Sequence, residues 1–198
     1  MACSATDTAG NTANAGFNVT VRDTTPPVIT VPGSVGVEAT GPSGATATFT
    51  AFTSDAVDGA GSATCVPASG SSFALGTTPV ACNATDARGN PAAPAGFNLT
   101  VHDTTRPVIA AHADVIAEAT GSGGASVSYV SPATSDLVDG SGTATCAPAS
   151  ASTFALGTTA VDCNATDAAG NDALSTTFNV IVRDTTPPVI AAHGNPTA

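Results

Sequence analysis

The stretch CNATDARGNPAAPAGFNLTVHDTTRPVI, residues 82–109, decides the fold, because nearly the same letters occur twice more in this chain of 198 residues. The other copies are CSATDTAGNTANAGFNVTVRDTTPPVI at 3–29 and CNATDAAGNDALSTTFNVIVRDTTPPVI at 163–190. The first cysteines of successive copies lie 79 and 81 residues apart, and the motif FALGTT also occurs twice, at 73–78 and 154–159. Self-similarity at a fixed period is the signature of a tandem array.

The register of the copies predicts four segments of unequal length. Residues 1–22 match the C-terminal part of a truncated repeat, and 184–198 match the start of a further one. Between them, residues 23–103 form a first complete repeat and residues 104–183 a second. We expect a window of a longer array, or an array whose ends are left open.

Alternating apolar and polar residues predict β-strands within each repeat. Phe97, Leu99 and Val101 alternate with polar residues, and the equivalent run from Phe17 to Val21 does the same. About seven such short runs, separated by turns rich in Gly, Pro and Asp, are typical of an all-β fold, a two-sheet antiparallel sandwich. Proline restricts the short connector at 104–107. We therefore expect sandwiches joined end to end in a rod.

The cysteines recur at one spacing. Cys65 and Cys82 lie 17 residues apart, and so do Cys146 and Cys163. A sandwich with so few aromatic residues needs reinforcement, so the equal spacings predict one disulfide in each repeat. Metal-thiolate binding is the alternative, but the chain has no Cys-x-x-Cys motif. Cys3, the equivalent of Cys82, is expected to pair outside residues 23–183 or to be free.

Charge and motifs exclude several functions. The chain has four Arg, no Lys and 15 acidic residues, a net charge of −11, so no basic face is available for nucleic-acid phosphates. It has no run of 18 apolar residues, and we expect no membrane insertion in this segment. No catalytic motif is present, and His112 has Pro32 at the equivalent place. We therefore expect no enzymatic activity.

The acidic residues recur at fixed places, which raises the hypothesis of a calcium site. Hard divalent cations bind carboxylate and amide oxygens. We expect one junction to gather Glu38, Asp103, Asp136, Asp139 and Asp167. The equivalent junction would use Asp23, Asp55, Asp58, Asp86 and Asn90. Turn chemistry is the alternative, because Asp before Gly and Asp-x-x-Gly-Asn both form tight loops without metal. Asp86 and Asp167 fit either role.

Taken together, the recurring sequence motifs of this chain resemble the hyalin repeat (HYR) family. The resemblance rests on DTTPPVI, VEAT, DAVDG, FALGTT and VACNATDARGN followed by GFNLTVHD, and it covers essentially the whole chain. It implies an immunoglobulin-like sandwich, tandem arrangement, an extracellular or cell-surface location and roles in adhesion or assembly. The expected partners are copies of itself or neighbouring repeats, and other surface or matrix components.

Two functions follow from the resemblance and the composition. The first is a stiff spacer in an extracellular fibre, stalk or surface adhesin. The alternative is a binding module that recognises a carbohydrate or a surface protein. Binding loops usually carry aromatic or Arg anchors, whereas these loops hold Gly, Ser, Ala and Asp, and the chain has no Trp. The loops therefore favour the spacer.

Overall fold

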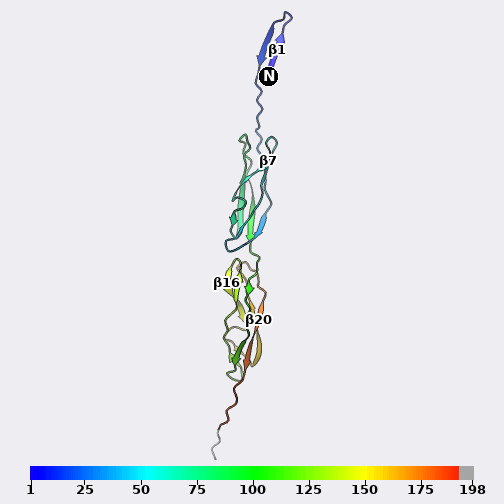
Figure 1. Ribbon diagram of the computed structural model, residues 1–198. Coiled ribbons are helices and arrows are strands. Elements are labelled where there is room, and N and C mark those ends of the chain that lie inside the picture. Colours follow the sequence, from blue (N-terminus) through cyan, green and yellow to red (C-terminus); the bar gives the residue numbers. More distant parts are fainter. Residues whose placement is uncertain (192–198) are drawn as a thin grey trace, which may run out of the picture. The chain divides into compact units, whose positions relative to one another are not determined.

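The computed structural model describes residues 1–191, and its regular elements are all β-strands (Figure 1). Among these residues, no helix is long and apolar enough to cross a membrane. The chain divides into two compact units. One contains residues 1–35, 47–71 and 78–99, and the other contains 36–46, 72–77 and the described residues from 100 onward. This division does not follow the repeats, so the predicted repeat boundaries stay predictions. Residues 192–198 of the predicted fourth segment lie outside the described residues.

The first repeat, residues 23–103, contains two main sheets. One has the strand order β4-β11-β10-β8; the other has β3-β6-β7, and β5 pairs separately with β9. Their bounds are β3 Val28–Thr30, β4 Val35–Glu38, β5 Ala45–Thr46, β6 Phe52–Asp55, β7 Gly59–Ser62, β8 Thr64–Val66, β9 Ser72–Phe73, β10 Gly76–Asn83 and β11 Ala95–His102. The run at 59–66 changes sheets, since β7 pairs with β6 whereas β8 pairs with β10.

The second repeat, residues 104–183, has the same strand orders, β13-β20-β19-β17, β12-β15-β16 and β14-β18. The strands are β12 Val108–Ile109, β13 Val115–Glu118, β14 Ala125–Ser126, β15 Ala133–Asp136, β16 Gly140–Thr143, β17 Thr145–Ala147, β18 Thr153–Phe154, β19 Gly157–Asn164 and β20 Thr176–Arg183. One pairing differs from the antiparallel expectation, because β13 runs parallel to β20. The first strand splits, so that β12 joins β15 in one sheet while β13 joins the last strand in the other.

The core is small and mostly aliphatic. In the second repeat it contains Phe154, Phe178, Val161, Val180 and the disulfide, all at most 9% exposed. The alternating residues of β19 and β20 supply most of it, as the period of two predicts. The aromatic residues at the rim are only half-buried, and Phe49 packs edge to face on Phe97 with ring centroids 4.9 Å apart. The prediction of an all-β chain of tandem immunoglobulin-like sandwiches is confirmed.

The predicted strand over residues 17–21 is wrong. The N-terminal segment forms only a hairpin of β1 (Ala2–Thr6) and β2 (Thr12–Gly16), with Cys3 opposite Ala15. Phe17 is 54% exposed and Val19 62%. In the first repeat the equivalent run lies in β11, between β4 and β10. Around residues 17–21 the described part of the chain supplies no such neighbours, so the alternating pattern has no sheet to join.

Both predicted disulfides are confirmed. Cys65 of β8 pairs with Cys82 of β10, and Cys146 of β17 pairs with Cys163 of β19. In each case the two cysteines are direct cross-strand partners in the register of one sheet. Cys82 and Cys163 are fully buried, so the disulfides are also part of the core. Among the described residues, Cys3 is exposed and free.

Replacing Cys65 and Cys82 together with Ala is expected to lower the free energy of unfolding of the first repeat by about 3 kcal/mol, because the crosslink limits the entropy of the unfolded chain. Urea denaturation monitored by NMR resonances of the first repeat measures the change. Cys3→Ala, at an exposed and unpaired position, is the control and should leave the midpoint unchanged. Equal midpoints for the double variant and the control would contradict the stabilising role.

Candidate functional site

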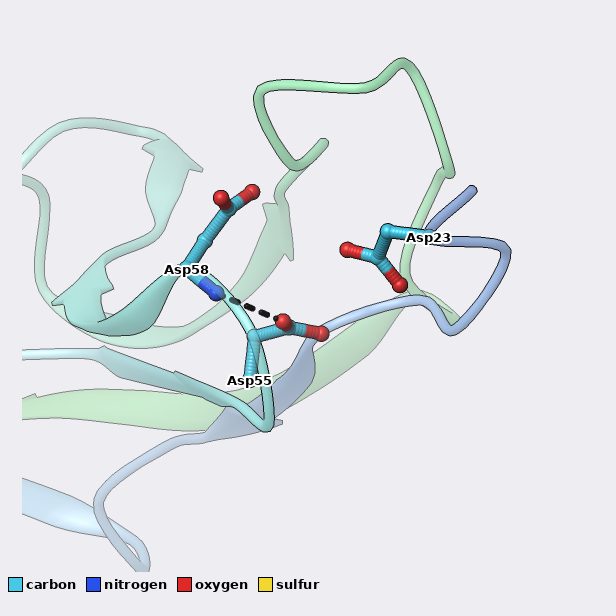
Figure 2. A group of neighbouring side chains, drawn as sticks. All are labelled: Asp23, Asp55 and Asp58. Carbon is cyan, nitrogen blue, oxygen red and sulfur yellow. Dashed lines mark hydrogen bonds between the residues drawn. The ribbon is translucent and has the colours of Figure 1, made fainter. Parts of the chain in front are cut away.

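Three aspartates meet where the linker before β3 comes close to the connection between β6 and β7, and the equivalent three meet in the second repeat. Asp55 ends β6 and Asp58 lies in the turn before β7, whereas Asp23 comes from the segment that precedes β3 (Figure 2). One carboxylate oxygen from each lies within 4.8 Å of the other two. We call this group the Asp23 cluster. Its equivalent in the second repeat, the Asp103 cluster, consists of Asp103, Asp136 and Asp139 and meets the same limit.

Turn geometry places the two loop aspartates of the Asp23 cluster. The N–H groups of Val57 and Asp58 donate to Oδ1 of Asp55 at 2.7 and 2.9 Å. Oδ2 of Asp58 accepts a hydrogen bond from the N–H of Ala87 at 2.9 Å. The two bonds to Asp55 are the turn chemistry that the sequence offers as the alternative to metal binding, whereas the bond to Asp58 joins two separate loops. They use one oxygen of each carboxylate, and the other oxygen stays available.

The Asp103 cluster repeats these contacts in the second repeat. Oδ1 of Asp136 accepts from the N–H groups of Val138 and Asp139 at 2.7 and 3.0 Å. Oδ2 of Asp139 accepts from the N–H of Ala168 at 2.6 Å. The same residue types thus build the same geometry in both repeats, which makes the cluster a property of the repeat.

Two carboxylates in each cluster have a buried oxygen without a partner. In the described residues, Oδ2 accepts no hydrogen bond in Asp23, Asp55, Asp103 and Asp136. A buried polar atom without a partner costs free energy. Open grooves of about 440 and 370 Å³ reach the loop acids of the two clusters, so water and ions have access. Three carboxylates with oxygens this close together suit a hard divalent cation, which is bound by oxygen ligands.

The negative charges of the Asp103 cluster repel one another, and the pKa of Asp103 is raised. Burial raises the pKa of Asp103 above its ordinary value of 3.8, and the charges of Asp136, Asp167 and Asp139 raise it further. The N–H of Thr105, which donates to Oδ1 of Asp103 at 3.1 Å, acts in the opposite direction. Repulsion between carboxylates of this kind is relieved by a proton or by a cation.

Asp86 and Asp167 lie outside the two clusters, and their oxygens serve their own loops. The backbone and side-chain amides of Asn90 donate to the two oxygens of Asp86 at 2.8 and 2.6 Å. Asn171 does the same for Asp167 at 2.7 and 2.8 Å. Burial acts to raise the pKa of both aspartates, but the hydrogen bonds outweigh it and the pKa of each is lowered.

The two asparagines also hold the linker backbone. Nδ2 of Asn90 donates to the carbonyl oxygen of Asp23 at 3.3 Å, and Nδ2 of Asn171 donates to that of Asp103 at 3.1 Å. In this geometry the amide nitrogen of Asn90 faces the linker. The asparagine therefore fixes the aspartate that carries a cluster carboxylate.

Glu38 also lies outside the Asp103 cluster. Its Oε1 accepts from the N–H of Thr104 at 2.7 Å, and its Oε2 accepts from the hydroxyl of Thr104 at 2.9 Å. The bond from the Thr104 N–H is the main reason that the pKa of Glu38 falls below 4.5. Glu118 binds Thr185 in the same way, at 2.7 Å for both bonds.

The two linker threonines, Thr104 and Thr105, are not among the site residues that the sequence predicts. Thr104 and Thr105 both donate hydroxyl hydrogen bonds to Glu38, at 2.9 and 3.3 Å. The signal was present, because Asp-Thr-Thr occurs in all three linkers and Glu-Ala-Thr-Gly in both complete repeats. Neither pattern alone says that the two segments are in contact, since 66 residues separate Glu38 from Thr104.

Disulfide-reinforced β-sandwiches that follow one another on short proline-containing linkers are typical of extracellular repeat proteins. The family model of the HYR domain matches residues 22–101 and 102–182 of this chain. The chain therefore belongs to the HYR domain family, which the resemblance predicted. The predictions of an extracellular location and of an extracellular repeat module are confirmed at the level of the family.

Two curated relatives are hyalins from sea urchins. The chain is 37% identical to hyalin of Strongylocentrotus purpuratus over 198 residues, which cover 96% of this chain and 16% of that protein. It is also 37% identical to hyalin of Lytechinus variegatus over 202 residues, which cover 93% of this chain and 37% of that protein. The chain thus spans well under half the length of the relatives it matches.

Solved structures give weaker similarities. Human protocadherin-24 EC1-2 matches with a TM-score of 0.37 and 15% identity, over 83% of this chain and 100% of that chain. The immunoglobulin domains 1–4 of Sidekick-1 match with a TM-score of 0.39 and 13% identity, over 91% of this chain and 57% of that chain. At these scores the fold assignment rests on the strand pairing and the family.

Asp103→Asn is expected to stabilise the second repeat at pH 7 in a calcium chelator. The amide keeps the oxygen that accepts from Thr105 but removes one of the repelling charges. Because the pKa of Asp103 is raised in the folded state, its charged form opposes folding at neutral pH, and this penalty disappears as the pH falls through that raised pKa. The gain in melting temperature should therefore shrink on acidification.

Asp184→Asn is the matched control, because Asp184 belongs to no acidic cluster in the described residues and likewise accepts from a threonine N–H two residues on. Thermal unfolding of both variants from pH 7 to pH 4 measures the difference. A variant Asp103→Asn that is no more stable than the wild type at pH 7 contradicts the electrostatic description.

Proposed function

We propose that this chain is a structural segment of an extracellular repeat array, a stiff spacer whose linkers are fixed by calcium. The observation that carries the proposal is the composition of the clusters. In each cluster, one carboxylate comes from the linker aspartate, and two come from the connection between β6 and β7 or its equivalent between β15 and β16. A cation bound there would tie the linker to that loop.

The donor set suits calcium. Calcium takes six to eight oxygens from carboxylates, carbonyls and water and tolerates irregular geometry, and extracellular modules bind it with dissociation constants of about 0.1–1 mM. Oδ2 of Asp103 and of Asp136 would take up the cation, since neither atom has a hydrogen-bond donor among the described residues. The grooves leave room for water to complete the coordination. When bound, the ion supplies positive charge and no chemical step, and the proposal includes no catalysis.

The linker itself supports a spacer role. Pro107 is buried, and only four residues separate Asp103 from β12. Proline restricts both its own backbone and that of the preceding residue. The connections β6–β7 and β15–β16, which carry the loop acids, contain no aromatic residue, and this favours a spacer over a module that recognises a carbohydrate or a protein. Partners would be neighbouring repeats and other components of the same matrix.

Calcium at 10 mM is expected to stabilise each repeat by about 1.4–2.7 kcal/mol, the mass-action effect of a site with a dissociation constant of about 0.1–1 mM. Thermal unfolding in calcium and in chelator measures the rise in melting temperature. Asp103→Asn should remove the rise for the second repeat, and the double variant with Asp23→Asn should abolish it. Asp184→Asn should keep it. The same melting temperature in calcium and in chelator favours turn chemistry alone.

A spacer also predicts restricted motion of one repeat against the next. In 10 mM calcium, ¹⁵N relaxation of the full chain should fit one common anisotropic tumbling for strands β10 and β19. Chelator or Asp103→Asn should bring the two repeats closer to independent tumbling. If the repeats tumble independently in calcium as well, the stiff spacer is refuted even where calcium binds.

A further inference from the structure

The linker of the second repeat is held from two directions. On one side, Oε1 of Glu38 accepts from the N–H of Thr104 at 2.7 Å, and the hydroxyls of Thr104 and Thr105 donate to the same carboxylate at 2.9 and 3.3 Å. On the other side, Asn171 donates to the carbonyl oxygen of Asp103 at 3.1 Å. Three hydrogen bonds to one charged group form a strong anchor, since bonds to charged groups exceed neutral ones.

The anchor reaches the cluster through one further bond. The N–H of Thr105 donates to Oδ1 of Asp103 at 3.1 Å, which leaves Oδ2 as the buried oxygen without a partner. Glu38 therefore holds the two residues whose backbone sets the direction of the Asp103 carboxylate. It does so without contributing an oxygen to the cluster, because both of its oxygens accept from threonine.

The Asp23 cluster has the same acids and is the reference site within the chain. The N–H of Thr25 donates to Oδ1 of Asp23 at 3.0 Å, and Asn90 donates to the Asp23 carbonyl at 3.3 Å. Within residues 1–191, however, no carboxylate accepts a hydrogen bond from Thr24, and Thr25 donates only to Asp23. A change at Glu38 therefore acts on the Asp103 cluster and has no contact through which to act on the Asp23 cluster.

We propose that Glu38 is a positioning residue for the cation at the Asp103 cluster, so that loss of Glu38 weakens calcium binding at this cluster. The proposal rests on the calcium function proposed above. A carboxylate that is already aimed at the site loses less freedom when the ion binds, and outer residues that orient metal ligands change affinity by about 10- to 100-fold. The affinity of one repeat's site is then set by the last residue of β4 in the repeat before it.

The test titrates calcium into the full chain and follows the amide resonances of Thr25 and Thr105, which report the two clusters separately. Glu38→Ala is expected to weaken the Thr105 site about 10-fold relative to the wild type. The Thr25 site of the same variant should be unchanged. Glu38→Gln, which keeps an oxygen for the N–H of Thr104, should give an intermediate loss.

The control is Glu118→Ala, which removes the same anchor from Thr185 and Thr186, next to Asp184. Because Asp184 joins no acidic cluster in the described residues, both calcium affinities should be unchanged. Amide hydrogen exchange in chelator adds a metal-free measurement, since Thr104 should exchange faster in Glu38→Ala.

The outcomes separate this inference from the function on which it rests. An unchanged affinity of the Thr105 site in Glu38→Ala, or a loss in Glu38→Gln as large as in Glu38→Ala, overturns the positioning role and leaves the calcium site standing. The second result would mean that the charge of Glu38 acts rather than its hydrogen bonds. If neither Thr25 nor Thr105 responds to calcium, both proposals are overturned.

Discussion

The register of one strand pair determines much of each repeat. Cys82 lies opposite Cys65, and the disulfide between them fixes β10 against β8 at the point where β10 ends. The chain then turns through Asp86 to Asn90, and this loop donates the N–H of Ala87 to Asp58 and the side-chain amide of Asn90 to the linker. Only four residues lie between Cys82 and Ala87, so the disulfide in the core also fixes the start of the loop that contacts the surface acids.

The Asp23 and Asp103 clusters concentrate negative charge at one place in each repeat. Most acidic residues in the repeats have donors that compensate them, as Asp86 has in Asn90 and Glu38 has in Thr104. In each cluster the linker aspartate and the first loop aspartate are left with one oxygen without a donor. Turn formation alone explains the Oδ1 atoms. It does not explain why two buried Oδ2 atoms share a space with a third carboxylate in both repeats.

Much of the fold could be predicted from local patterns, because strands such as β11 and β20 bury alternate residues and the cysteine spacing repeats. The same pattern failed at Phe17, since alternation says that a strand can be half-buried but not whether neighbours exist to bury it. The sequence also did not predict that β7 and β8 belong to different sheets, because tertiary packing determines the strand with which each one pairs. The periodicity of one segment does not identify its partner strand.

The site was predicted in outline for a related reason. Recurrence identified Asp103, Asp136 and Asp139 as a set, and the structure brings them together. It also included Glu38, Asp86 and Asp167, whose oxygens are occupied by neighbouring donors. A residue type shows what a side chain could bind, whereas the donors that satisfy it are set by contacts over long sequence separations, such as the 66 residues from Glu38 to Thr104.

The placement of these contacts has a consequence for how such a chain can change length. The acids of one cluster lie within a short span, from Asp103 to Asp139, and each repeat supplies the glutamate for the linker that follows it. Equivalent residues of the similar stretches 82–109 and 163–190 lie 81 positions apart at both ends of the stretch. A duplication or deletion of one whole period, wherever its breakpoints fall, would therefore join equivalent positions and leave every cluster with its full set of acids. The gene for such an array can gain or lose repeats by unequal recombination without creating a defective joint.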